Sequence, residues 1–179
     1  SRPIVERTAA FNDGEVMNVI ATVARHPKLL KRWTVFGNHI LGGSTLPARE
    51  RELVILRTGF VASSPYEWVQ HVKIARQAGC TDEEIERVMS GPDHPDWSDT
   101  DRALLEATDE LMADRFISDQ VWGALRSKWS EQQCMDLVFT VGQYCLVSMA
   151  LNTFGVQIED GVERFPSALF TDGPFSDVP

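Results

Sequence analysis

The stretch SSPYEWVQH, residues 63–71, follows one segment with a helical pattern and contains the beginning of the next. It carries a concentrated group of polar side chains. Pro65 suits the first turn of a helix, and the amphipathic residues that follow it reach an expected end at Gly79. The segment before it, residues 47–62, contains Glu52. Because a short loop joins the two segments, we expect two helices that pack as antiparallel neighbours.

Helical periodicity extends over most of the chain, and no segment alternates with period two for long enough to be a convincing strand. Thr81 and Glu84, for example, have the spacing of a capping box that begins a helix. The sequence therefore predicts a single all-α domain of about seven helices over residues 1–158. Residues 159–179 are rich in Gly, Pro, Asp and Phe, and we expect a C-terminal extension that lies along another surface or is mobile.

The last long helix, expected over residues 131–156, has apolar residues on more than one face, including Leu137, Phe139 and Leu146. A helix that is hydrophobic nearly all round must be buried, either in the centre of the domain or against a partner.

The composition narrows the class of protein. The 179 residues carry a formal net charge of -9 and no basic run stands out, which disfavours nucleic acid and anionic membrane surfaces as partners. No apolar run is expected to approach the roughly 20 residues of a membrane span. The three cysteines, Cys80, Cys134 and Cys145, form no CxxC motif and favour a reducing compartment. We therefore expect a cytoplasmic protein.

Glu67 and His71 are four residues apart, so a helix places them on one face, and Glu52 could approach from the neighbouring helix. A carboxylate that holds an imidazole fixes its tautomer and lets it exchange a proton near neutral pH. A second carboxylate, desolvated by Trp33 or Trp68, could remain protonated and act as an acid. The spacing alone favours an ordinary ion pair on a solvated helix face, because such pairs are common.

Two other chemistries fit the same residues less well. A hydrolase triad of Ser64, His71 and a Glu would need a G-x-S-x-G elbow on a strand, and neither is present in the sequence. We expect Ser64 to act instead as the N-cap of the helix that begins near Pro65. Glu52, Glu67 and His71 could ligate a metal, but the second Glu-x-x-His arm of a di-metal bundle is missing. We expect neither a metal nor a cofactor.

Residues 46–88, LPARERELVILRTGFVASSPYEWVQHVKIARQAGCTDEEIERV, resemble the core of the carboxymuconolactone decarboxylase family, whose superfamily also contains the alkylhydroperoxidase AhpD-like proteins. The matching features are the LPARERELV opening, the aromatic-Glu-Trp before the His, the H…A…G pattern from His71 to Gly79, and TDEEI. The resemblance extends over roughly residues 15–158, through RHPKLLKRW upstream and residues 131–156 downstream. It implies a compact all-α bundle that assembles into trimers or hexamers.

In the AhpD-like branch the working residues are a Glu, a Cys twelve positions later, a second Cys three further on and a His four further on. The corresponding positions here are Glu52, Ser64, Glu67 and His71. The acid and the imidazole are kept, and both thiols are absent. Reduction of peroxide by this route needs a thiolate and a resolving thiol. The resemblance therefore favours the decarboxylase branch, which relies on His and polar neighbours to move protons.

Together, the residues and the resemblance predict a cofactor-independent, lyase-type enzyme that acts on a small organic acid, lactone or enolisable carbonyl compound. His71 is the expected general acid/base, Glu52 its orienting carboxylate and Glu67 a second acid. The expected substrate-binding side chains are Trp33, Ser64, Trp68 and Tyr144. The alternatives are an AhpD-like peroxidase or oxidoreductase and a non-catalytic oligomeric protein that binds a small molecule. The expected partners are a small-molecule substrate and copies of the same chain, with neither nucleic acid nor membrane.

Overall fold

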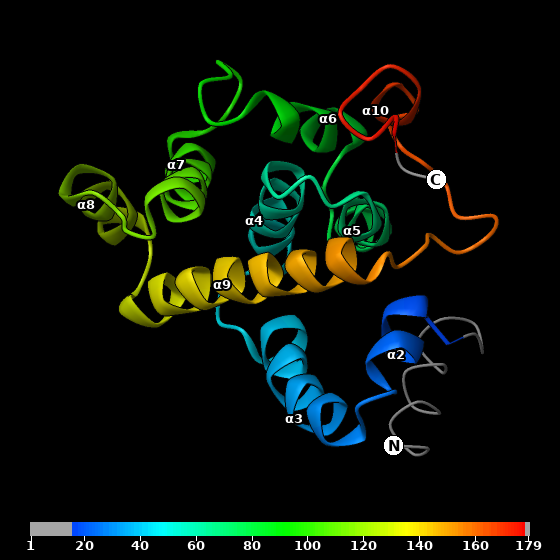
Figure 1. The fold of residues 1–179 in the computed structure, drawn as a ribbon. Helices are drawn as coiled ribbons and strands as arrows, with labels where there is room; N and C mark the ends of the chain where they lie inside the picture. Colours follow the sequence, from blue (N-terminus) through cyan, green and yellow to red (C-terminus); the bar gives the residue numbers. More distant parts are fainter. Residues whose placement is uncertain (1–15, 178–179) are drawn as a thin grey trace.

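The computed structural model describes residues 16–177, and within them every regular element is helical (Figure 1). The elements are α2 (Asn18–Val23), α3 (Pro27–Asn38), the π-helical turn η1 (His39–Gly43), α4 (Ala48–Val61), α5 (Pro65–Gln77), α6 (Asp82–Ser90), α7 (Asp99–Asp114), α8 (Asp119–Lys128), α9 (Glu131–Phe154) and α10 (Ala168–Thr171). The prediction of an all-α fold is confirmed.

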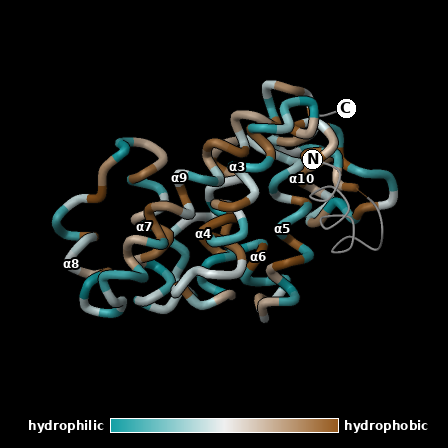
Figure 2. The backbone as a smooth tube through the Cα atoms, turned by 90° about the horizontal axis from the view of Figure 1, so that it is seen from below, coloured by the Kyte–Doolittle hydropathy of each residue, from teal (hydrophilic) through white to brown (hydrophobic). Residues whose placement is uncertain are grey.

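Helix α4 forms the centre of the molecule. Four consecutive residues, Leu53, Val54, Ile55 and Leu56, are fully buried, which is possible only where neighbours cover a helix on several sides. Leu53 and Leu56 belong to a core shared with α5 and α6, whereas Val54 belongs to a core shared with α7, α8 and α9. Figure 2 shows this hydrophobic stretch of α4 between the two groups of helices.

Helix α9 crosses the face formed by α4, α5, α7 and α8 (Figure 1). The prediction that no apolar run approaches the length of a membrane span is wrong, because α9 is long and apolar enough by length and composition. Half of its most apolar window is buried inside the protein. Its outward side also carries apolar residues: Met135, Val138, Phe139, Leu146, Met149 and Phe154 are all exposed.

The turn between α4 and α5 determines how the two helices meet. Ser63 has a left-handed backbone, with φ of 49°, and Asn152 on α9 donates hydrogen bonds to its carbonyl and to that of Ala62. Pro65 occupies the first position of α5, as predicted. Ser64 occupies the N-cap position, but its hydroxyl makes no capping hydrogen bond, so that prediction is wrong. Its ψ of 88° differs from the 163° of the capping Ser130, and the hydroxyl is therefore not directed at the free amides.

The C-terminal segment lies along α5 and shares the core of that side. The indole of Trp68 donates a hydrogen bond to the Phe165 carbonyl at 2.7 Å. The Phe175 ring, which is buried, lies edge-on to Trp68 and Phe60 with ring centroids 6.5 and 6.2 Å away. Leu169 and Phe175 of this segment are thus part of the core that α5 shares with α4 and α6.

Candidate active site

Glu52, Glu67 and His71 meet between α4 and α5. His71 Nδ1 is 2.6 Å from Glu52 Oε2, and His71 Nε2 is 3.0 Å from Glu67 Oε1. All three side chains are buried, and Glu52 is completely inaccessible. The structure therefore brings together the three residues that the spacing singled out, and it excludes an ion pair on a solvated helix face.

A close approach of the two helices makes this geometry possible. Gly59 on α4 lies against the first turn of α5, where Glu67 sits. A Cβ at position 59 would be 3.4 Å from the Glu67 Cγ, at the close end of ordinary van der Waals contact. A larger residue at Gly59 would push Glu67 away from its position beside His71.

Arg51 extends the group behind Glu52, and the sequence analysis did not identify it. Its Nε and Nη2 atoms both lie 3.1 Å from Glu52 Oε1, while the other oxygen of Glu52 bonds His71. Adjacent residues on a helix do not normally face each other, so the spacing gave no signal for this contact. The result is a buried row of alternating charges that runs from Arg51 through Glu52 and His71 to Glu67.

Both ring nitrogens of His71 face a carboxylate, and a neutral imidazole has only one N–H to donate. The arrangement therefore favours the doubly protonated imidazolium. Burial by itself lowers the pKa of His71, but the charges and hydrogen bonds of Glu52 and Glu67 outweigh burial and raise it to about 10. At neutral pH His71 is thus an acid held between two bases.

Tyr144 on α9 also lies against the imidazole of His71. Its ring lies edge-on to the imidazole, with centroids 4.8 Å apart. Burial and the nearby charges of Glu67 and Glu52 raise the pKa of Tyr144 well above its usual value, so the phenol stays protonated. A protonated hydroxyl next to His71 can donate a hydrogen bond to a bound molecule.

A cavity of about 180 Å³ opens on this group between α2, α3, α5 and α9. Glu67, His71, Tyr144 and Trp33 line it, as do residues that the prediction did not commit to, such as Gln70 and Gln143. Glu52 does not reach the cavity and acts on it only through His71.

Two residues predicted to bind substrate lie elsewhere. Trp68 is fully buried on the opposite side of α5, against Phe60 and Phe175. Ser64 is also completely buried, and its hydroxyl has no hydrogen-bond partner within residues 16–177. Neither side chain lines the cavity. The phase of α5 turns Trp68 to the core and leaves Glu67 and His71 on the cavity side.

The cysteines show no redox arrangement. Cys80, Cys134 and Cys145 are all free, and Cys80 and Cys134 are buried. Burial raises the pKa of the Cys80 thiol to about 12, which disfavours the reactive thiolate. In the part of the chain that the structure describes, no group of three or more His, Cys, Asp or Glu side chains is placed to hold a metal ion.

Comparison with known proteins agrees with the resemblance found in the sequence. Residues 27–110, which include Glu52, Glu67 and His71, match the carboxymuconolactone decarboxylase family. Over these residues the chain is similar to that family. No curated protein sequence matches the chain.

Solved structures show the same fold. The alkylhydroperoxidase AhpD core of Ralstonia eutropha, a peroxidase-related protein, has a TM-score of 0.80 at 21% identity and covers 89% of this chain and 87% of its own. A protein of unknown function from Agrobacterium tumefaciens has a TM-score of 0.72 at 19% identity, over 77% of this chain and 95% of its own. A debrominase in complex with 2,3,4-tribromopyrrole has a TM-score of 0.76 at 14% identity, over 88% and 84%. The AhpD-like fold predicted from the sequence is therefore confirmed.

Proposed function

We propose that this protein, which is similar to the carboxymuconolactone decarboxylase family over residues 27–110, is a cofactor-independent, cytoplasmic acid–base enzyme of the lyase or isomerase type. Its substrate would be an enolisable carbonyl compound, a lactone or a small organic acid. The observation that carries the proposal is His71, bonded by both ring nitrogens to buried carboxylates at the wall of a cavity. His71 and Glu67 lie 3.0 Å apart and both line the cavity, and titratable groups with perturbed pKa values in a cavity are typical of functional sites.

The chemistry follows from which groups reach the cavity. Glu67, which the sequence suggested as a second acid, is the base in this proposal and accepts a proton from the carbon next to the substrate carbonyl. His71 Nε2 donates its proton to the carbonyl oxygen, so that an enol forms without a free enolate. Glu52 and Arg51 stay behind the imidazole and hold its orientation and charge. The reverse transfers, with the proton returned to a different carbon or exchanged with water, release the product.

The test is exchange of carbon-bound hydrogen for deuterium in D₂O, followed by NMR. Cyclohexanone, γ-butyrolactone and levulinate represent the three substrate classes. We expect exchange with at least one of them that depends on His71 and is about 10²–10⁴-fold slower in His71→Gln. If none of the three exchanges faster with the wild type than with this variant, acid–base catalysis at His71 is wrong, and a site that only binds its ligand becomes the better account.

The structure also bears on thiol chemistry. We expect negligible thiol-dependent turnover of peroxide, since two of the three cysteines are buried and Ser64 and Glu67 stand at the positions of the AhpD-like thiols. A variant with all three cysteines replaced by alanine should keep the exchange activity, apart from a loss of stability at the buried positions. The measurement is a coupled peroxide assay on both proteins. Robust turnover by the wild type that disappears in the cysteine-free variant would assign the protein to the peroxidase branch.

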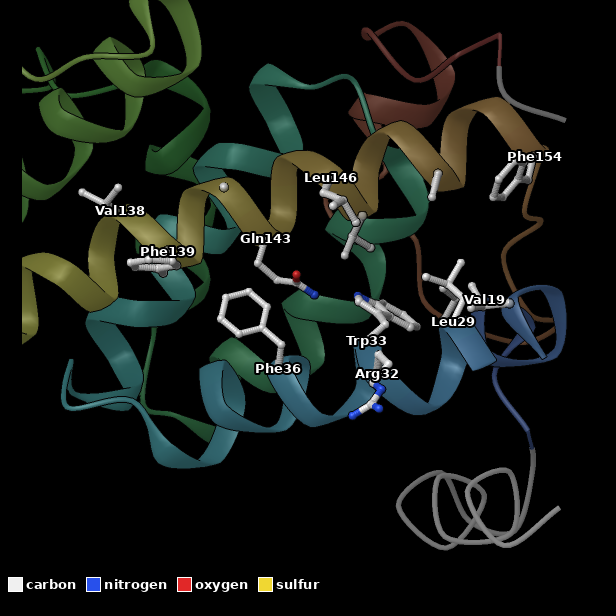
Figure 3. Close-up of a pocket in the computed structure, with 14 residues that line it drawn as sticks. Val19, Leu29, Arg32, Trp33, Phe36, Val138, Phe139, Gln143, Leu146 and Phe154 are labelled. Atoms are coloured by element: carbon white, nitrogen blue, oxygen red, sulfur yellow. The ribbon is translucent and has the colours of Figure 1, made fainter. Parts of the chain in front are cut away.

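We further propose that the protein is a trimer or hexamer in which a second copy covers the groove between α3 and α9. The groove has a volume of about 660 Å³, and Figure 3 shows the apolar side chains of the two helices that line it, among them Phe36, Phe139 and Leu146. Phe139 and Leu146 are 53% and 54% exposed, and with the other apolar side chains of the groove they form the kind of exposed patch that marks an interaction surface. Trp33 and Gln143 line both the groove and the cavity, so a second copy seated here would close the cavity from water.

Two charged substitutions in the groove test the proposed assembly. Phe139→Glu with Leu146→Glu should convert the oligomer into a particle of 20.1 kDa, because two carboxylates cannot be buried in an apolar interface. Phe116→Glu is the matched control, since Phe116 is 65% exposed but lies outside the groove. Light scattering distinguishes the states. A wild type that is already monomeric at micromolar concentration would contradict the proposal.

A further inference from the structure

The size of the cavity beside His71 limits what can occupy it. A protein cavity of roughly 150 Å³ lined by apolar side chains accommodates one benzene molecule. The cavity here measures about 180 Å³ and has apolar walls that include Ile20, Leu41, Ile74 and Val147. One six-membered ring with a short substituent therefore fills it.

The charge around the cavity is balanced and already paired. Within the described part of the chain, its lining contains neither Lys nor Arg. The charged groups that reach it, Glu67 and His71, bond each other, and Glu52 and Arg51 lie behind them. Two carboxylates, one imidazolium and one guanidinium sum to zero, so the site offers no unpaired charge to an ion.

Binding of a charged ligand would therefore cost the free energy of removing that ligand from water, and no new ion pair would offset this cost. A carboxylate would lose its hydration without gaining a free cation, and it would face the carboxylate of Glu67. The formal net charge of -9 on the chain opposes it further. An organic cation would find the carboxylate of Glu67 already bonded to His71.

Neutral polar groups remain for recognition. Tyr144 offers a protonated hydroxyl beside the imidazole, and Gln143 offers an amide. Figure 3 shows the Gln143 side chain projecting from α9 toward Trp33 on α3, at the junction of cavity and groove. No hydrogen bond within residues 16–177 occupies either of these two side-chain groups in the absence of a ligand. Such uncharged donors and acceptors match a carbonyl or hydroxyl group.

We propose that this cavity selects an uncharged compound with a single ring and one carbonyl or hydroxyl substituent, such as a cyclic ketone or lactone, and rejects carboxylates. The inference rests on the proposed site and narrows its substrate class. It also narrows the class of reaction. A decarboxylation needs a carboxylate substrate and is therefore disfavoured, whereas enolisation and isomerisation do not need one. The small organic acid expected from the sequence is the substrate class that this charge balance disfavours.

Three probes of equal size separate shape from charge: benzamide, benzoate and benzamidinium have the same number of heavy atoms and differ in charge. We expect the full-length protein at pH 7 to bind benzamide at least tenfold more tightly than either ion, as measured by calorimetry or ligand-observed NMR. Ile74→Trp fills the cavity and should abolish this binding. Gln143→Lys adds a cation to the wall and should improve the affinity for benzoate at least tenfold.

Binding does not require turnover, so the outcome is independent of the exchange test of the proposed function. Benzamide that binds to a protein without exchange activity would leave this inference standing and overturn only the catalysis. Benzoate or benzamidinium binding as tightly as benzamide would overturn the inference. So would absence of benzamide binding, or benzamide binding that Ile74→Trp leaves unchanged.

Discussion

Replacing Glu52 with alanine is expected to lower the free energy of unfolding by about 3–5 kcal/mol, the usual cost of removing one partner from a buried ion pair. Glu52 is completely buried and bonds Arg51 on one oxygen and His71 on the other. Its removal leaves two buried cationic groups without their shared anion. Glu52→Gln keeps the shape and loses only the charge, and we expect a smaller loss of about 1–3 kcal/mol.

Asp96→Ala is the matched control for this measurement. Asp96 is largely exposed, and its oxygen lies 3.9 Å from both Arg87 and His94. Exposed pairs of this kind contribute about 0–1 kcal/mol. Urea denaturation of the three variants and the wild type gives the comparison. A loss below 1 kcal/mol for Glu52→Ala would mean that the buried row of charges does not hold together in solution.

Replacing His71 with glutamine is expected to slow hydrogen exchange of the responsive substrate by about 10²–10⁴-fold, the range associated with a general acid or base. Glutamine can donate a hydrogen bond but cannot release its proton at any pH used. His39→Gln is the control, since His39 also pairs with a carboxylate, at 3.3 Å from Asp136, but does not line the cavity. An equal loss in both variants would show that the effect is not specific to His71.

The pH dependence follows from the raised pKa of His71. The imidazolium is the acid in the reaction, so exchange should persist through neutral pH and decline as the pH rises toward 10. The same group stabilises the fold. Because its folded pKa lies above the unfolded value, its contribution to stability is fully present below about pH 6.5 and is lost as the pH approaches 10. The wild type should therefore lose stability more steeply than His71→Gln over this interval.

The sequence predicts those features that periodicity and local signals encode. Helical spacing gives the all-α fold, the capping box at Thr81 is present in the structure, and the four-residue spacing of Glu67 and His71 places both on the side of α5 that meets α4. These features depend on neighbours along the chain, which a linear pattern records.

Other features depend on contacts that spacing does not record. Arg51 bonds Glu52 only because both are enclosed by other helices, and adjacent residues on an isolated helix would point apart. Trp68 fits a pocket wall and a core position equally well in the sequence, and the packing of Phe175 from the distant C-terminal segment places it in the core. Ser64 has the residue type and position of an N-cap but not the backbone angles.

The central claim is that His71 is an imidazolium held between two carboxylates, and its ionisation can be measured directly. In protein labelled with ¹⁵N, the imidazole nitrogens of His71, assigned by comparison with His71→Gln, report how many protons the ring carries. The account predicts that both nitrogens are protonated at pH 7 and that the ring titrates near pH 10. A neutral ring at pH 7, with a single protonated nitrogen and a titration at or below about 6.5, would contradict it.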